Sequence, residues 1–109
     1  GAPKAKQIAS AQVTFDGKTV EVSQQDMQIA ADLAGGLRRW FGKTEQTMPR
    51  AYITYQLTNG TQVVIGANET TIYENGRYYP NKGEKGKLFE QVVEGLFFGG
   101  EIPEQPQGE

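Results

Sequence analysis

The chain has 109 residues, of which 37% are hydrophobic and 22% charged, and this is the ordinary composition of a single small globular domain. It contains no Cys and no His, which excludes disulfides, zinc–thiolate sites, Cys nucleophiles and His-based acid–base catalysis. The net charge of -2 offers no basic field for nucleic acid, and no apolar run approaches the ~20 residues that span a bilayer.

The two ends differ in composition from the middle of the chain. Residues 1–7 are small and basic without an apolar period, which indicates a flexible lead-in. Residues 101–109 are acidic, rich in Pro and Gln, and predicted to be a disordered tail. Residues 8–100 then form one domain. Because the chain begins with Gly rather than Met, we expect a processed or trimmed product, for which a missing signal peptide is uninformative.

The first expected element is a β-hairpin centred on Asp16-Gly17, a dipeptide typical of two-residue turns. A two-residue turn places Phe15 opposite Lys18 and Val13 opposite Val20. That register gathers the apolar side chains on one face of the hairpin and the polar ones on the other.

A helix is expected next, with Ser23 as its N-cap. Apolar residues recur at helical spacing from Met27 to Phe41. Gly35-Gly36 falls inside this run and indicates either a break or a site of close backbone contact. Because the apolar period continues through it unshifted, the pattern favours one helix with a weak middle, ended by Gly42. On this interpretation Trp40 is a core residue. Arg38 and Arg39 would lie near the helix C-terminus, where the helix dipole favours cations.

Two further hairpins follow from Arg50 onward. The hydrophobic pattern predicts a three-residue loop at residues 58–60, with Gly60 in a left-handed conformation, because that register unites the apolar face. A two-residue turn at Asn75-Gly76 then pairs Tyr73 with Tyr78. A last helix is expected over about residues 86–98, ended by Gly99-Gly100. The order ββ-α-ββ-ββ-α predicts an α+β fold, an antiparallel sheet of hairpins with two helices on one face.

The sequence contains little that points to catalysis or to a cofactor. Glu84, Glu90 and Glu94 lie on or near the last helix, where a solvated face explains them. No clustered Asp or Asn residues suggest a Ca²⁺ or Mg²⁺ loop, and Gly83–Lys87 lacks the spacing of a phosphate-binding loop. We therefore expect no enzyme, no metal and no cofactor. A hydrolase that uses carboxylates alone remains the less favoured alternative.

The candidate ligand-binding residues are Tyr52, Tyr73 and Tyr78, which the three registers place on the sheet face away from the helices. Thr54, Gln56, Val64 and Thr71 are expected on the same face. Tyrosine is a rigid amphipathic contact group enriched at interfaces, so this face could bind a protein, a peptide or a glycan. The competing interpretation is that Tyr and Thr are there for their strand propensity alone.

In layout the chain resembles small extracytoplasmic domains, lipoprotein-like or secreted, of Gram-positive bacteria. The resemblance lies in a short Lys-rich lead-in, the hairpin of residues 13–20, a helix, and hairpins with Asn-Gly turns, among them Thr71–Tyr79. It implies an exported or cell-envelope domain of unknown function, and it carries no functional residues with it. The chain has no Cys for lipidation, so a lipid anchor would belong to an upstream segment that has been trimmed.

Together these features predict a non-enzymatic, extracytoplasmic binding domain of bacteria. The expected partner is a protein, a peptide or a glycan, with no nucleic acid and no membrane span in this chain. The alternative is a small cytosolic regulatory domain that binds a partner. A signal peptide in the upstream gene sequence would distinguish the two.

Overall fold

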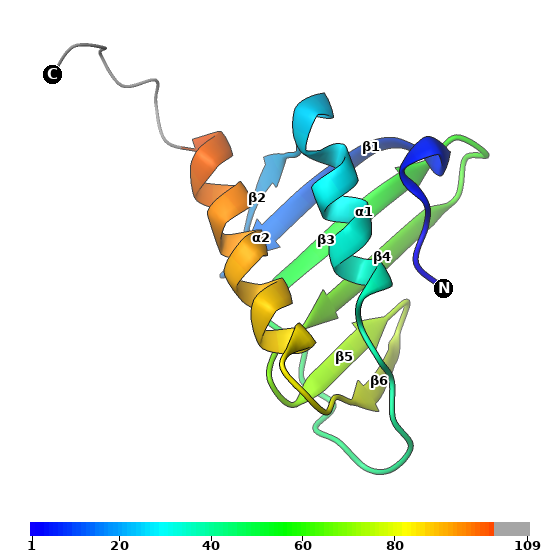
Figure 1. The fold of residues 1–109 in the computed structure, drawn as a ribbon, viewed down its shortest axis with the longest axis vertical. Coiled ribbons are helices and arrows are strands. Elements are labelled where there is room, and N and C mark those ends of the chain that lie inside the picture. Colours follow the sequence, from blue (N-terminus) through cyan, green and yellow to red (C-terminus); the bar gives the residue numbers. More distant parts are fainter. Residues whose placement is uncertain (102–109) are drawn as a thin grey trace, which may run out of the picture.

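The computed structural model describes residues 1–101 and is an α+β fold, as the sequence predicted. Six antiparallel strands form one sheet in the order β2-β1-β3-β4-β5-β6 (Figure 1). The strands are β1 (Ile8–Phe15), β2 (Lys18–Glu21), β3 (Ala51–Leu57), β4 (Gln62–Ala67), β5 (Thr71–Glu74) and β6 (Arg77–Pro80). The helices are α1 (Met27–Gly35) and α2 (Lys85–Glu101), with short 3₁₀ turns η1 (Ala5–Gln7) and η2 (Gln24–Asp26).

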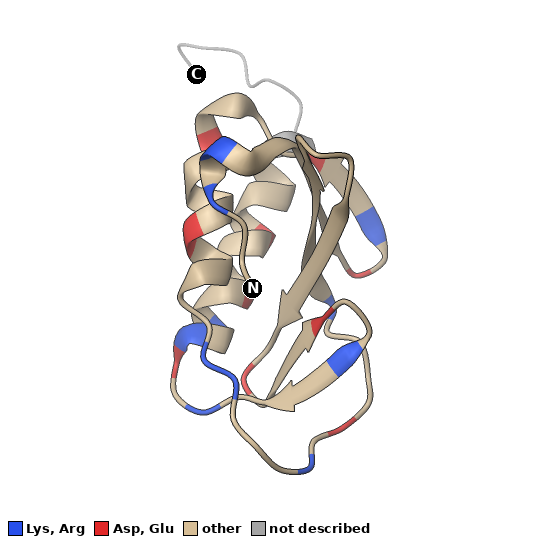
Figure 2. Ribbon diagram, turned by 90° about the vertical axis from the view of Figure 1, so that its right-hand side faces the viewer, with Lys and Arg blue, Asp and Glu red and all other residues tan. Residues whose placement is uncertain are grey.

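Both helices cover the same face of the sheet, and the hydrophobic core lies between the two layers (Figure 2). Helix α2 packs across β1 and β3, and α1 contacts both η1 and α2. The largest fully buried side chains come from both layers and include Tyr55, Phe89, Ile53, Ile65 and Ile72. The Tyr55 hydroxyl donates a hydrogen bond of 2.7 Å to the Ala30 carbonyl, which ties the middle of the sheet to α1.

All three hairpin registers are confirmed. Val13 pairs with Val20, Tyr55 with Val63, and Tyr73 with Tyr78. Both two-residue turns have positive φ at their two central residues, as a type I′ turn requires. Gly60 has a φ of +88° in its three-residue loop, which is the left-handed conformation that the hydrophobic pattern predicted.

The first helix is shorter than predicted, because α1 ends at Gly35 and does not continue to Phe41. Beyond Gly36, the helix C-cap, the chain turns to the outer edge of β6. There Arg39 forms a bridge with Asn81, and the Trp40 N–H donates to the Pro80 carbonyl at 3.0 Å. These bonds to an edge strand outweigh helix continuation through two glycines, each of which costs ~1 kcal/mol in a helix.

Several expectations about the two ends of the first helix are therefore wrong. Trp40 is not a core residue, since 47% of its surface is exposed, and Phe41 is fully exposed. Gly42 does not cap a helix but has a φ of +123° in the connection from α1 to β3. Ser23 precedes η2 instead of α1, and its hydroxyl donates to the Asp26 carboxylate at 3.1 Å rather than to a backbone N–H.

The ends of the domain also differ from expectation. Helix α2 continues through Gly99-Gly100 to Glu101, so those glycines do not end it. The lead-in, residues 1–7, contains η1 and the buried side chain of Pro3, and Ala2 and Ala5 pack against the core. The predicted disordered tail lies, apart from Glu101, outside the described residues. Within residues 1–101, neither helix is long and apolar enough to cross a membrane.

Candidate functional site: a tyrosine face on the open side of the sheet

The side of the sheet away from the helices carries a cross-strand row of aromatic residues. Strand pairing places Tyr52 beside Gly66, Gly66 beside Tyr73, and Tyr73 beside Tyr78, so that all three tyrosines predicted from the sequence share one row. We call the surface around this row the tyrosine face; it comprises Tyr52, Tyr73 and Tyr78 together with Thr54, Gln56 and Val64. Each of these side chains is partly exposed.

Tyr73 and Tyr78 form the best-defined part of the row. Their ring centroids lie 5.1 Å apart at an interplanar angle of 63°, the edge-to-face geometry that aromatic pairs favour. The turn that brings them together is held by Asn75, whose side-chain oxygen accepts a hydrogen bond of 2.8 Å from the Val64 N–H. The Asn75 N–H in turn donates to the Val64 carbonyl at 3.0 Å. The tip of the β5–β6 hairpin is therefore fixed to β4, and the two rings are held in place before any ligand arrives.

Gly66 makes the row possible, although the sequence analysis assigned it no role. A Cβ at this position would lie 2.8 Å from the Tyr52 Cβ and 3.0 Å from the Ala51 carbonyl oxygen. Real Cβ atoms do not approach so closely, so any other residue would displace Tyr52. Glycine in the middle of a strand is a signal of such close approach, and it is the signal that could have identified this position.

Beside the aromatic row lies a chain of polar side chains that crosses four strands. The Gln12 amide donates to Glu21 at 2.9 Å, and the Gln56 amide donates to Gln12 at 3.4 Å and to Gln62 at 3.1 Å. These bonds orient the amides. They leave the face with aromatic contact area on one half and oriented hydrogen-bonding groups on the other.

One edge of the tyrosine face is covered by the connection from α1 to β3, which the sequence analysis did not foresee. The hydroxyls of Thr44 and Thr71 share a hydrogen bond of 2.9 Å, and the Cγ of Pro49 lies 3.6 Å from the Cβ position of Gly66. Thr71 is consequently buried, so its expected place on the exposed face is wrong. Residues 44–49 therefore border the tyrosines, and Pro49 also covers the Gly66 position between Tyr52 and Tyr73.

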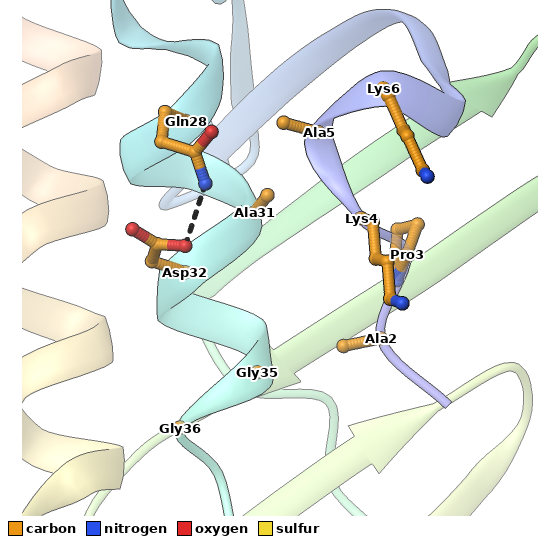
Figure 3. Close-up of a pocket in the computed structure, with 10 residues that line it drawn as sticks. All are labelled: Ala2, Pro3, Lys4, Ala5, Lys6, Gln28, Ala31, Asp32, Gly35 and Gly36. Atoms are coloured by element: carbon orange, nitrogen blue, oxygen red, sulfur yellow. Dashed lines mark hydrogen bonds between the residues drawn. The ribbon is translucent and has the colours of Figure 1, made fainter.

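A second surface feature is an open groove of about 740 Å³ between α1 and the N-terminal segment (Figure 3). Alanine and glycine supply much of its lining, including Ala31, Gly35 and Gly36. Its two polar groups on α1 are engaged with each other, since the Gln28 amide donates to Asp32 at 2.9 Å. The sequence does not predict this groove, because the groove requires residues 1–7 to lie ordered beside α1 rather than to form a flexible lead-in.

Among the carboxylates considered for catalysis, Glu90 is engaged in an ion pair. Glu90 accepts a hydrogen bond of 2.8 Å from the Arg50 guanidinium, whose pKa is raised chiefly by this bond. Arg50 also lies over the Phe15 ring at 4.8 Å, so this pair links the loop before β3 to α2. In the part of the chain that the structure describes, no group of three acidic side chains could hold a metal ion.

No protein-family model, curated protein or solved structure matches this chain.

Proposed function

We propose that this chain is a non-enzymatic, extracytoplasmic binding domain that contacts a protein or peptide through its tyrosine face. The observation that supports this most strongly is the aligned row of Tyr52, Tyr73 and Tyr78 on the sheet face away from the helices. A fold of this kind needs one sheet face buried, and the other can be polar throughout. Three tyrosines that each keep part of their surface exposed give this face more aromatic contact area than its solvation requires.

The shape of the face favours a protein or peptide over a small molecule. Small-molecule ligands are usually enclosed in concave pockets, whereas protein partners bind broad surfaces with aromatic anchors at the centre and polar groups around them. The tyrosine face is broad, with the tyrosines on one half and the amides of Gln12, Gln56 and Gln62 on the other. The ordered turn at Asn75 keeps the anchors rigid, which lowers the entropy cost of binding.

The edges of the sheet are poor alternatives for recognition. At β6, the bridge from Arg39 to Asn81 and the bond from Trp40 to Pro80 occupy backbone groups that an added strand would need. At the other edge, β2 has only four residues, and it carries exposed Lys18 and Glu21. Binding by strand addition is therefore disfavoured, and the face of the sheet is the better candidate.

The extracytoplasmic part of the proposal rests on the resemblance of the hairpins and Asn-Gly turns to domains exported by Gram-positive bacteria. The sequence of the gene upstream of Gly1 tests it. A signal peptide, with or without a Cys for lipidation, would support export. An upstream cytosolic domain would favour the alternative, a regulatory domain inside the cell.

The binding part of the proposal can be tested with peptides selected from a random-peptide phage library on the immobilised domain. Titration calorimetry then measures the affinity of a selected peptide for the wild type and for Tyr52→Ser, Tyr73→Ser and Tyr78→Ser. We expect each change to weaken binding by about 1–3 kcal/mol, the range of interface anchors. The free energy of unfolding should fall by only about 1–2 kcal/mol, because contacts such as the Tyr73–Tyr78 ring pair are lost but no core contact is.

The matched control is Gln91→Ser, which alters an exposed residue of α2 on the opposite layer and should leave affinity unchanged. Peptides that bind the tyrosine variants as tightly as the wild type would contradict the proposal. So would a large loss of stability in these variants with binding intact, since the tyrosines would then be structural. Tyrosine-dependent binding on a glycan array, with no peptide selected, would show that the ligand class is wrong.

A further inference from the structure

The connection from α1 to β3 lies at one end of the molecule (Figure 1). It carries two large apolar side chains that are exposed to solvent. Phe41 is 101% exposed and Trp40 is 47% exposed, and they are adjacent in the chain. Folding does not require either exposure, since both residues could be polar without loss of a core contact. Adjacent exposed aromatics of this kind mark a contact surface.

These side chains are held outward by the contacts of the connection on either side of them. The Trp40 N–H is bonded to the Pro80 carbonyl, and Arg39 pairs with Glu74 on β5 and forms the bridge to Asn81. On the other side, Thr44 is bonded to Thr71. Phe41 therefore lies at the crest of a loop that is anchored before and after it.

Basic residues surround this crest, although the chain as a whole is acidic. Residues 36–48 contain three basic residues and one acidic residue. Residues 77–87 contain four basic residues and one acidic residue. Both segments are therefore positively charged, whereas the whole chain has a net charge of -2. The Lys82 ammonium lies 4.6 Å from the centre of the Trp40 ring, and the Lys85 side chain reaches within 3.9 Å of the Cβ position of Gly36. Figure 2 shows Lys and Arg, with acidic residues among them, at the end of the molecule that carries the connection.

We propose that this aromatic–basic tip, made of Arg38, Trp40, Phe41, Lys43 and Lys82, docks the domain on the surface of a membrane that contains anionic phospholipids. Trp favours the membrane–water interface, and a Phe beside it adds apolar area that can enter the acyl boundary. Lysines and arginines at the level of the headgroups are attracted to anionic lipid. The tip thus combines the two signals that stable interfacial binding needs.

A bilayer fits this tip better than an acidic protein does. Phe41 projects from a crest with its whole surface exposed, so a protein partner would need a pocket shaped to receive it. A fluid bilayer needs no matching pocket. Docking by this end of the long axis leaves the tyrosine face unobstructed, and the proposal does not depend on what that face binds.

Trp40 is the only tryptophan of the chain, so its fluorescence reports directly on the tip. Large unilamellar vesicles of phosphatidylcholine with about 30 mol% phosphatidylglycerol serve as the probe, with pure phosphatidylcholine as the comparison. We expect a blue shift of Trp40 emission and co-sedimentation with the anionic vesicles only, both reduced by salt. Brominated lipids should quench the emission, because the indole enters the interface.

Two variants separate the apolar and the electrostatic contributions. Phe41→Ser removes a fully exposed side chain and should reduce the partition coefficient about tenfold. The double variant Arg38→Gln/Lys43→Gln should reduce it about twenty-fivefold, at about fivefold for each charge near the surface. Ile29→Ser, which alters a 45% exposed residue on α1, and Lys6→Gln/Lys18→Gln, with the same change in net charge, are the matched controls and should bind as the wild type does.

Three results would overturn the proposal. The first is a wild-type protein that neither shifts its emission nor sediments with anionic vesicles. The second is binding that Phe41→Ser and Arg38→Gln/Lys43→Gln leave unchanged. The third is a Trp40 shift with polyglutamate but not with anionic vesicles, which would assign the tip to an acidic protein instead.

Discussion

Gly86 allows the start of α2 to lie directly against the turn that precedes β5. A Cβ at this position would lie 2.0 Å from the Asn68 carbonyl oxygen and 2.2 Å from the Asn81 side-chain nitrogen. That nitrogen donates hydrogen bonds of 3.1 Å to the Asn68 carbonyl and 3.2 Å to the Glu69 carbonyl. Gly86→Ala must therefore move backbone as well as a side chain, and it disturbs two partly buried hydrogen bonds.

Overpacking at such a site costs about 1–3 kcal/mol, and each disturbed hydrogen bond adds about 1 kcal/mol. Alanine recovers up to ~1 kcal/mol through its better helix propensity. We therefore expect Gly86→Ala to lower the free energy of unfolding by about 2–4 kcal/mol.

The matched control for this prediction is Gly95→Ala in the same helix. Gly95 is exposed, and no heavy atom lies within 4 Å of its Cβ position, so alanine should raise the free energy of unfolding by up to ~1 kcal/mol. Urea denaturation followed by circular dichroism measures both variants. Opposite signs are expected. Two stabilised variants would refute the close packing of α2 on Asn68 and Asn81.

Three further substitutions test other parts of the structure. Gly60→Val should cost about 1 kcal/mol or more in thermal denaturation, because a β-branched residue strains a φ of +88°; an unchanged midpoint would argue against the three-residue loop. Gly66→Ala should cost about 1–3 kcal/mol by displacing Tyr52, and a crystal structure of the variant with Tyr52 in place would contradict this. Burial raises the pKa of Tyr55, so the folded state keeps its hydroxyl proton to higher pH than the unfolded chain does. Its contribution to stability should accordingly be present at neutral pH and be lost as pH rises above about 10. Tyr55→Phe should lose about 1 kcal/mol at pH 7 and show a shallower decline at alkaline pH, whereas parallel pH profiles of the two proteins would refute this assignment.

The hairpins were predictable from the sequence because turn chemistry and side-chain alternation specify the same register. Asp16-Gly17 and Asn75-Gly76 supply two residues that tolerate positive φ, and the alternation admits only one pairing that buries the apolar side. At Gly60 the two signals conflict, and the hydrophobic pattern prevails. A register slip would expose a whole row of apolar residues, whereas a different loop length costs little.

The Gly35-Gly36 pair is the one local signal for the end of α1, and the apolar periodicity argues against it. The apolar period continues past Gly35 to Phe41, yet Trp40 and Phe41 are on the surface. The helix ends because the residues that follow Gly36 form backbone hydrogen bonds at the outer edge of β6. That strand lies about forty residues further along the chain. The spacing of apolar residues is a local pattern, so it cannot reveal that a strand so distant in sequence offers these hydrogen bonds.

The candidate site was predicted in part. The hairpin registers predict that the side chains of Tyr52, Tyr73 and Tyr78 lie on the sheet face away from the helices. They do not predict the border formed by residues 44–49, because it depends on the path of an irregular connection. The register predicted from the sequence already places Gly66 opposite Tyr52, but the distance of 2.8 Å that requires glycine there is visible only in the structure.

The central claim is that the tyrosine face is the binding surface of this domain. Amide chemical-shift mapping of the labelled domain during titration with a library-selected peptide tests it most directly. Shifts concentrated on β3, β4, β5 and β6, with the largest around Tyr52, Tyr73 and Tyr78, are the result that our account predicts. Shifts concentrated on α1 and α2, with the tyrosines unaffected at saturation, would contradict it.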